Sequence, residues 1–171
     1  MAEFHITAPE RLIAEHDISV FNNGLHASLD DWLRERALAS EGASARTYVV
    51  CDATKPLKVV GYYTIATAME QRAALPTAKL RRGMPDQVPL LLLARLAVDA
   101  SFQGSGLGAD LLADALGRCV AASEIAGARA VVVHAIDEKV AAFYAHYGFT
   151  ASPLGELVML MPMETVRSFR P

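Results

Sequence analysis

The 171-residue sequence has little cysteine, no long hydrophobic run and no excess of basic charge. Its two cysteines, Cys51 and Cys119, are too few for a disulfide framework and lack metal-ligand spacing, so we expect a reducing cytoplasm and no metal. The longest apolar run, Pro89 to Val98, is interrupted by Arg95 and reaches only half of the roughly 20 residues that span a bilayer. We therefore expect no membrane segment.

The N-terminus also lacks a positive patch followed by an apolar core, which predicts no secretion signal. The formal net charge of −3 gives no global attraction to nucleic acid. One segment differs from this average, because basic residues outnumber the single acid, Asp86, between Gln71 and Val88. These basic residues are Arg72, Lys79, Arg81 and Arg82. If the protein binds a polyanion, we expect the contact there.

What the sequence does contain is enough apolar material for one packed domain over residues 1–171. It is 53% hydrophobic and 20% charged, which excludes a disordered or fibrous chain. Helices are predicted over residues 28–40 (with Ser28 as the N-cap), 106–122 and 137–147. Strands are predicted over 47–51, 58–68, 88–98, 130–134 and 157–163, with a loop over 71–88. This order predicts an α/β (α+β) fold with a mixed sheet and helices on both faces.

A glycine cluster follows the third predicted strand in the stretch RLAVDASFQGSGLG, residues 95–108. A strand, a glycine loop and a helix in that order place bare amides at the positive end of a helix, where a phosphate binds well. A P-loop is excluded because Gly106-Leu-Gly108 contains no lysine. The looser dinucleotide pattern of Gly104–Ala109 begins too late in the chain for a doubly wound sheet to follow. Glycines that only permit close helix–strand packing remain the alternative.

Gln103–Gly108 matches Q/R-x-x-G-x-G/A, the pyrophosphate loop of the GNAT N-acetyltransferase superfamily. Leu96-Ala-Val-Asp99 resembles the splayed fourth strand of that family, and Ala142–Phe149 resembles its A-x-x-F-Y-x-x-x-G-F region. The resemblance covers roughly residues 45 to 163 and implies the GNAT fold with acetyl-CoA as cosubstrate. The cofactor-binding residues that it implies are Leu96, Ala97, Val98, Gln103, Gly104, Ser105, Gly106, Leu107, Gly108 and Phe143.

The chemistry that the resemblance implies is transfer of acetyl from CoA to a primary amine. A backbone N–H within Leu96–Val98 would stabilise the oxyanion. Tyr144 stands at the family's tyrosine position and would protonate the leaving thiolate, although ordinary aromatic packing is the alternative. No carboxylate stands out as a base: Glu70 and Asp99 are candidates that are more often surface or turn residues.

One branch of the superfamily is especially similar, namely the GNAT toxins of toxin–antitoxin pairs, which acetylate the amino acid on charged tRNA. The N-terminal resemblance lies in His16–Gly24, Leu29–Leu33 and Arg46–Val49. An aminoacyl ester presents an amine of low pKa, which suits an enzyme without an obvious base. Expected substrate contacts are Arg95, Lys79, Arg81, Arg82 and His134. The alternatives are a solvated loop for the basic run and a hydrogen-bonded strand-end residue for His134.

Two features depart from that branch: the acidic overall charge and the pair Asn22-Asn23. Arg95 inside an apolar strand should have a carboxylate or ligand partner, because burying an unpaired cation is costly. The resemblance further implies a homodimer and a ribbon-helix-helix antitoxin as partners. The alternatives are acetylation of a small amine or a protein N-terminus, or an acyl-CoA-binding module without catalysis.

Overall fold

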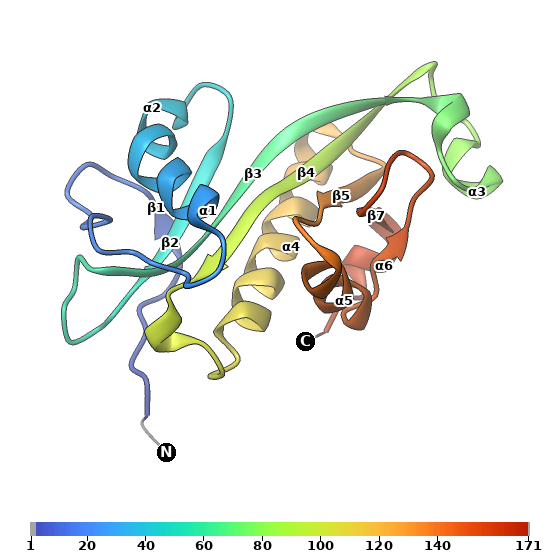
Figure 1. Ribbon diagram of the computed structural model, residues 1–171. Helices are drawn as coiled ribbons and strands as arrows, with labels where there is room; N and C mark the ends of the chain where they lie inside the picture. The colour runs from blue at the N-terminus through green and yellow to red at the C-terminus, as the bar shows by residue number, and fades with distance from the viewer. Residues whose placement is uncertain (1–2, 171) are drawn as a thin grey trace. The chain divides into compact units, whose positions relative to one another are not determined.

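The computed structural model describes residues 3–170, which form two compact units (Figure 1). Unit 1 contains residues 3–65 and Arg95–Asp114, and unit 2 contains Ala66–Ala94 and residues 115–170. The strands are hydrogen-bonded in the order β1-β2-β3-β4-β5-β7-β6, and β3, β4 and helix α4 each contribute residues to both units.

Unit 1 begins with an irregular segment and a two-residue strand that pairs with the first full strand. Its elements are β1 (Glu10–Arg11), α1 (Ala27–Trp32), a π-helical turn (Leu33–Ala37), α2 (Leu38–Ser40), β2 (Arg46–Cys51), the first part of β3 (Val59–Gln71), a 3-10 turn (Ala100–Phe102) and the start of α4 (Leu107–Ala126). The helix predicted over residues 28–40 is therefore present. The prediction of Ser28 as its N-cap is wrong, because the helix already begins at Ala27.

Helices cover both faces of the β2–β3 pair. Val49 and Tyr62 pack in one apolar cluster with Leu33 of the π-helical turn. On the opposite face, Gly61 lies so close to α4 that a Cβ there would meet a Leu111 methyl at 3.0 Å. The absence of a side chain at this position lets the helix approach the sheet.

Unit 2 contains the rest of the long strands and the C-terminal elements. These are the remainder of β3, a 3-10 turn (Arg72–Ala74), α3 (Ala78–Arg81), most of β4 (Gln87–Val98), the rest of α4, β5 (Ala130–His134), α5 (Glu138–His146), β6 (Thr150–Ala151), β7 (Val158–Pro162) and α6 (Met163–Arg167). Its core includes Leu80, Val88, Leu90, Val132 and Leu160.

Strands β4 and β5 are parallel, whereas β5–β7 and β2–β3 are antiparallel, so the sheet is mixed as predicted. The last residue pair between β4 and β5 is Leu93 with Val133, although β4 continues to Val98. This early end of pairing is the splay predicted for the fourth strand. The single domain expected over residues 1–171 stays a prediction. In the described part of the chain, no helix is both long and apolar enough to cross a membrane.

Candidate functional site

The glycine loop before α4 has the backbone geometry that a phosphate site needs. Gly104 and Gly106 adopt φ values of +78° and +84°, which L side chains rarely adopt. A Cβ at either position would meet no atom within 4 Å, so these two glycines do not serve close packing. They instead turn the chain into the first turn of a 20-residue helix, whose free amides begin at Leu107.

Polar side chains brace this loop from within. The Gln103 amide nitrogen donates hydrogen bonds to the carbonyl oxygens of Asn23 (2.7 Å) and Val98 (3.0 Å). The Ser105 hydroxyl donates to the Phe102 carbonyl at 2.6 Å. Since both donors are used inside the protein, these side chains fix the loop, and the backbone amides remain as the groups suited to an anion.

Asp99 closes the end of β4 and connects it to the N-terminal segment. Its carboxylate accepts hydrogen bonds from the Ser101 amide (3.0 Å), the Ser101 hydroxyl (2.6 Å) and the Asn22 amide (3.0 Å). The Asp99 amide donates to the Val60 carbonyl at 2.8 Å. Leu96, Ala97 and Val98, the residues expected to offer an oxyanion-binding N–H, directly precede this anchored position. The three hydrogen bonds make Asp99 a structural cap rather than a ready base.

Arg95 lies over an aromatic ring instead of beside a carboxylate. Its guanidinium carbon is 4.0 Å from the centroid of the Trp32 ring, and Trp32 itself stacks on Tyr62. Burial lowers the pKa of Arg95 from its ordinary value, partly offset by Tyr62. No carboxylate among residues 3–170 forms an ion pair with Arg95.

The nitrogens of Arg95 are also accessible. No fully buried side-chain nitrogen or oxygen in the described chain lacks a hydrogen-bond partner, and Arg95 forms no hydrogen bond there. The face of the guanidinium is therefore covered by Trp32 while its N–H groups reach solvent. Trp32 was missed by the sequence analysis because its contact is with a residue distant in the chain.

Tyr144 lies on α5 with its ring packed and its hydroxyl without a hydrogen-bond partner among the described residues. The residue is 5% exposed, and its ring makes edge contacts with Phe143 and Phe149. Burial raises its pKa above the ordinary value of 10.0, so the phenol keeps its proton at neutral pH. The hydroxyl forms no hydrogen bond with another described residue and yet is not fully buried. Packing accounts for the ring but leaves the hydroxyl without a structural role.

The other candidates of unit 2 are more exposed. His134 is exposed at the end of β5, where its backbone pairs with Val158. Glu70 accepts a hydrogen bond from the Gln71 amide at 2.9 Å, which is a local turn contact. Phe143 is half-buried and packs on Tyr147. None of these contacts forms an acid–base pair, so no dedicated base emerges.

The basic segment, residues 71–88, folds around α3. The N-cap residue of α3, Thr77, accepts a hydrogen bond from the Leu80 amide. Arg72 pairs with Asp86 at 2.9 Å, and Arg81 donates to the Leu75 carbonyl at 2.6 Å. Lys79 and Arg82 are exposed, so they are the cations most available to an external anion.

Arg129 supports this segment, which the sequence did not indicate. Its guanidinium donates to the carbonyl oxygens of Lys79 (2.9 Å) and Leu80 (3.3 Å) and pairs with Glu164. The basic turn, residues 77–82 around α3, is thereby held by the residue that directly precedes β5.

Among the described residues, Glu10, His16 and Cys51 bring metal-ligating atoms within 4.8 Å of one another. His16 Nδ1 already accepts a hydrogen bond from the Ile13 amide, and Nε2 contacts Glu10 at 2.8 Å. A metal-binding histidine instead donates from its second nitrogen. Burial raises the pKa of the Cys51 thiol to about 11, which opposes formation of the thiolate ligand. The arrangement is better suited to a Glu10–His16 hydrogen bond than to a metal.

Comparisons with known proteins agree with the phosphate-binding loop that this geometry indicates. Residues 43–151 match a family model described as an acetyltransferase (GNAT) domain. A tRNA-acetylating toxin of Mycobacterium tuberculosis is 44% identical over 164 residues, which cover 95% of this chain and 95% of that protein.

Two solved structures share the fold over nearly the whole chain. AtaT complexed with acetyl-methionyl-tRNAfMet has a TM-score of 0.86 at 30% identity and covers 96% of this chain and 98% of that chain. A Tyr-to-Phe mutant of AtaT, bound to the C-terminus of the antitoxin AtaR and to acetyl-CoA, has a TM-score of 0.81 at 29% identity. Its coverage is 95% of this chain and 96% of that chain.

Proposed function

Because this chain belongs to the GNAT acetyltransferase family, we propose that it transfers acetyl from acetyl-CoA to the α-amino group of an aminoacyl-tRNA. Family membership confirms the acetyltransferase activity and the GNAT fold predicted from the sequence, and acetyl-CoA is the cosubstrate. The 44% identity to a tRNA-acetylating toxin supports the charged tRNA as acceptor. A charged tRNA as acceptor supports a cytoplasmic location.

The observation that carries the proposal is the loop of Gln103–Gly108. Its two left-handed glycines leave open space where a Cβ would stand, and its polar side chains are used internally. The amides at the start of α4 are thus left for the pyrophosphate of acetyl-CoA, with the helix dipole favouring negative charge there.

The reaction needs few groups from the protein. The free amine attacks the thioester carbonyl, a C–N bond forms, and the oxyanion is stabilised by a backbone N–H within Leu96–Val98. When the C–S bond breaks, the thiolate of CoA receives a proton from the Tyr144 hydroxyl. The amine loses its proton to solvent, and the Tyr144 phenolate takes a proton back from solvent before the next turnover. An α-amino group, with a pKa of about 7.7–8.0, is roughly one-tenth unprotonated at neutral pH, and a neighbouring ester lowers its pKa further, whereas a lysine amine near 10.4 is almost entirely protonated.

The acceptor end of the tRNA would be held by cations from separate parts of the chain. Lys79 and Arg82 offer exposed charges for phosphates, with Arg81 on the same turn. Arg95 offers outward N–H groups, and His134 a ring at the end of β5. The proposed partners are a second copy of the chain and an antitoxin of the ribbon-helix-helix type, supported by the antitoxin bound to AtaT.

The test measures thiol release from acetyl-CoA with charged and with uncharged bulk tRNA, at low and at moderate salt. The expected result is release only with charged tRNA, suppressed by salt because displaced counterions favour binding, and lost with Tyr144→Phe. Arg167→Ala is a control for the loss of one positive charge, since this exposed arginine lies outside the basic segment of residues 71–88.

The alternatives make different predictions in the same assay. Release with small amines or peptide N-termini, insensitive to salt and without response to charged tRNA, would reject the tRNA substrate. Binding of acetyl-CoA without turnover on any amine would leave an acyl-CoA-binding module.

A further inference from the structure

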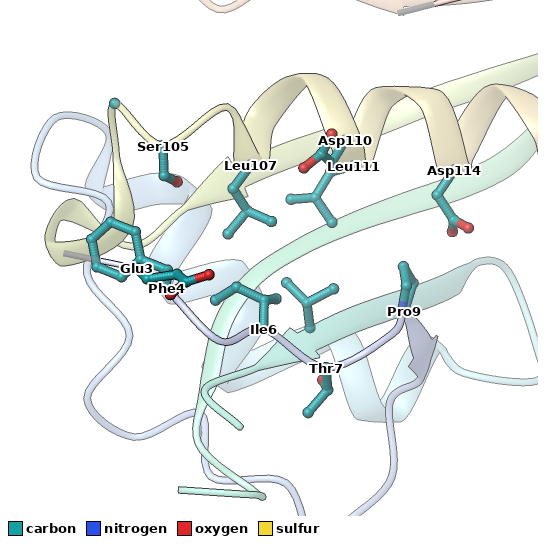
Figure 2. Close-up of a pocket in the computed structure, with 12 residues that line it drawn as sticks. Glu3, Phe4, Ile6, Thr7, Pro9, Ser105, Leu107, Asp110, Leu111 and Asp114 are labelled. Carbon is teal, nitrogen blue, oxygen red and sulfur yellow. The ribbon is translucent and has the colours of Figure 1, made fainter. Parts of the chain in front are cut away.

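A groove of about 1110 Å³ opens on the side of α4, and the sequence analysis gave no indication of it. Figure 2 shows the first two turns of α4 as one wall and the N-terminal segment from Glu3 to Pro9 as the other. The floor is apolar and includes Val50 of β2 with Leu107 and Leu111. All of these residues belong to unit 1.

The helix wall has two rows with helical spacing. Leu107 and Leu111 form the lower row, and Asp110 and Asp114 form a row beside it, each pair four residues apart on one face of α4. Figure 2 shows Leu107 and Asp114 pointing toward the N-terminal segment. The apolar row is almost fully buried, whereas Asp110 is exposed.

The charge of the groove is of one sign. Glu3, Asp110 and Asp114 line it, and none of its twelve lining residues is basic. The Asp110 side chain makes no hydrogen bond or ion pair with any other residue from 3 to 170. Asp114 is different, since its carboxylate accepts a hydrogen bond from the Tyr63 hydroxyl. An acidic rim over an apolar floor disfavours a phosphate-bearing ligand and favours a cationic one.

The spacing of the carboxylates identifies the shape of that ligand. Residues four apart on a helix are separated by about 6 Å along the axis. Alternate side chains of an extended peptide are separated by about 6.6 Å and point to the same side, while the residue between them points to the other. A basic–apolar–basic segment therefore matches the rim with its charges and the floor with its apolar side chain.

We propose that this groove binds an extended peptide segment of a partner protein in which Lys or Arg alternates with apolar residues. The groove also touches Gly104 and Ser105 of the glycine loop, and Phe4 at its end packs on Phe102, the residue before Gln103. A bound segment would thus contact the loop that the enzyme uses for acetyl-CoA. The proposal does not depend on which amine is acetylated.

The experiment uses the full chain and three labelled synthetic peptides. The first alternates Arg and Leu over five residues, the second has the same composition with the three arginines together, and the third alternates Glu and Leu. Affinity is read from fluorescence anisotropy, and the location from the methyl resonances of Ile6 and Val50. We expect saturable binding of the alternating basic peptide alone, with shifts at both methyl groups.

Variants on α4 test which carboxylate the basic peptide contacts. Asp110→Lys should weaken binding about fivefold to tenfold, because one attraction is replaced by one repulsion at a partly solvated site. Asp110→Asn should give a smaller loss of peptide affinity, and it replaces Asp110→Lys in the test if the lysine variant does not fold. Glu124→Lys makes the same charge change on the same helix outside the groove and should leave the affinity within twofold.

Several outcomes would overturn the proposal. These are no saturable binding, equal affinity for the clustered-arginine peptide, or equal weakening by Asp110→Lys and Glu124→Lys. If Asp110→Lys changes the molar mass by light scattering and no peptide binds, a second copy of the chain occupies the groove. If acetyl-CoA rather than the peptide shifts Ile6 and Val50, the groove belongs to the cofactor.

Discussion

Replacing Arg95 by leucine removes the guanidinium that lies 4.0 Å above the Trp32 ring. A cation–π contact is worth about 0.5–1 kcal/mol at an exposed site and about 2 kcal/mol when desolvated. Arg95 is half-buried, and burial lowers its pKa, so its surroundings are between these limits. We expect a coupling free energy of about 1 kcal/mol between the two side chains.

The coupling is measured by a double-mutant cycle in chemical denaturation. Arg95→Leu, Trp32→Leu and the double variant are compared with the natural chain by the free energy of unfolding, and Arg95→Lys keeps the charge without the flat stacking surface. A coupling free energy below about 0.3 kcal/mol, which is within the error of additivity, would refute the stacking argument.

The same variants test whether Arg95 holds the acceptor. Its N–H groups reach solvent and have no protein partner in the described chain, so we expect Arg95→Lys and Arg95→Leu to raise KM for charged tRNA while KM for acetyl-CoA is kept. The expected rise is about tenfold, which corresponds to one charge-assisted hydrogen bond of roughly 1.5 kcal/mol. A folded Arg95→Ala variant with full turnover and unchanged KM would show that the residue is structural only.

Three further predictions concern the proton donor, the glycine loop and the basic turn. Tyr144→Phe should lower kcat about a hundredfold or more with little change in unfolding free energy, because its hydroxyl makes no hydrogen bond among the described residues. Gly106→Ala, at φ +84°, should cost about 1–2 kcal/mol of stability and weaken acetyl-CoA binding in calorimetry. Lys79→Ala with Arg82→Ala should weaken binding of charged tRNA and flatten its dependence on salt, measured by filter binding.

Each of these has a result that contradicts it. Full activity of Tyr144→Phe would return that residue to ordinary packing. Gly117→Ala, in open space within α4, should stabilise the chain by about 0.5–1 kcal/mol, so equal destabilisation at Gly117 and Gly106 would reject the backbone argument. An unchanged salt slope after both basic substitutions would place the tRNA elsewhere.

The elements that sequence predicts well here are those with a local signal. The glycine loop and α4 follow from the spacing of Gly104, Gly106 and Leu107, since left-handed φ and helical periodicity are decided by neighbouring residues. The two-residue strands β1 and β6 have no such periodicity, because they exist only through pairing with β2 and β7. Nothing in the residues of these two strands predicts them.

Contacts between residues that are distant in the sequence explain the other features of the structure that the sequence did not predict. The sequence indicated that Arg95 needs a carboxylate or a ligand as its partner, because burying an unpaired cation is costly. The partner is a tryptophan 63 positions earlier, brought there by the packing of α1 on β3 and by the register of β4. Arg129, which holds the backbone of the basic turn, was likewise hidden because its partners are carbonyl groups, whose identity no residue type reveals.

The described residues include no dedicated base, and this is informative about the substrate. Both carboxylate candidates accept hydrogen bonds from nearby backbone groups, and those at Asp99 fix the end of β4. An enzyme built this way cannot supply the several kcal/mol needed to deprotonate a lysine amine at neutral pH, because each unit of pKa corresponds to about 1.4 kcal/mol. It can act on an amine that already loses its proton near neutrality. An amine beside an ester bond is of that kind, so the acceptor matches the acid–base groups of the described residues: the substrate brings its own acidity, and the role that we propose for Tyr144 is to protonate the departing thiolate.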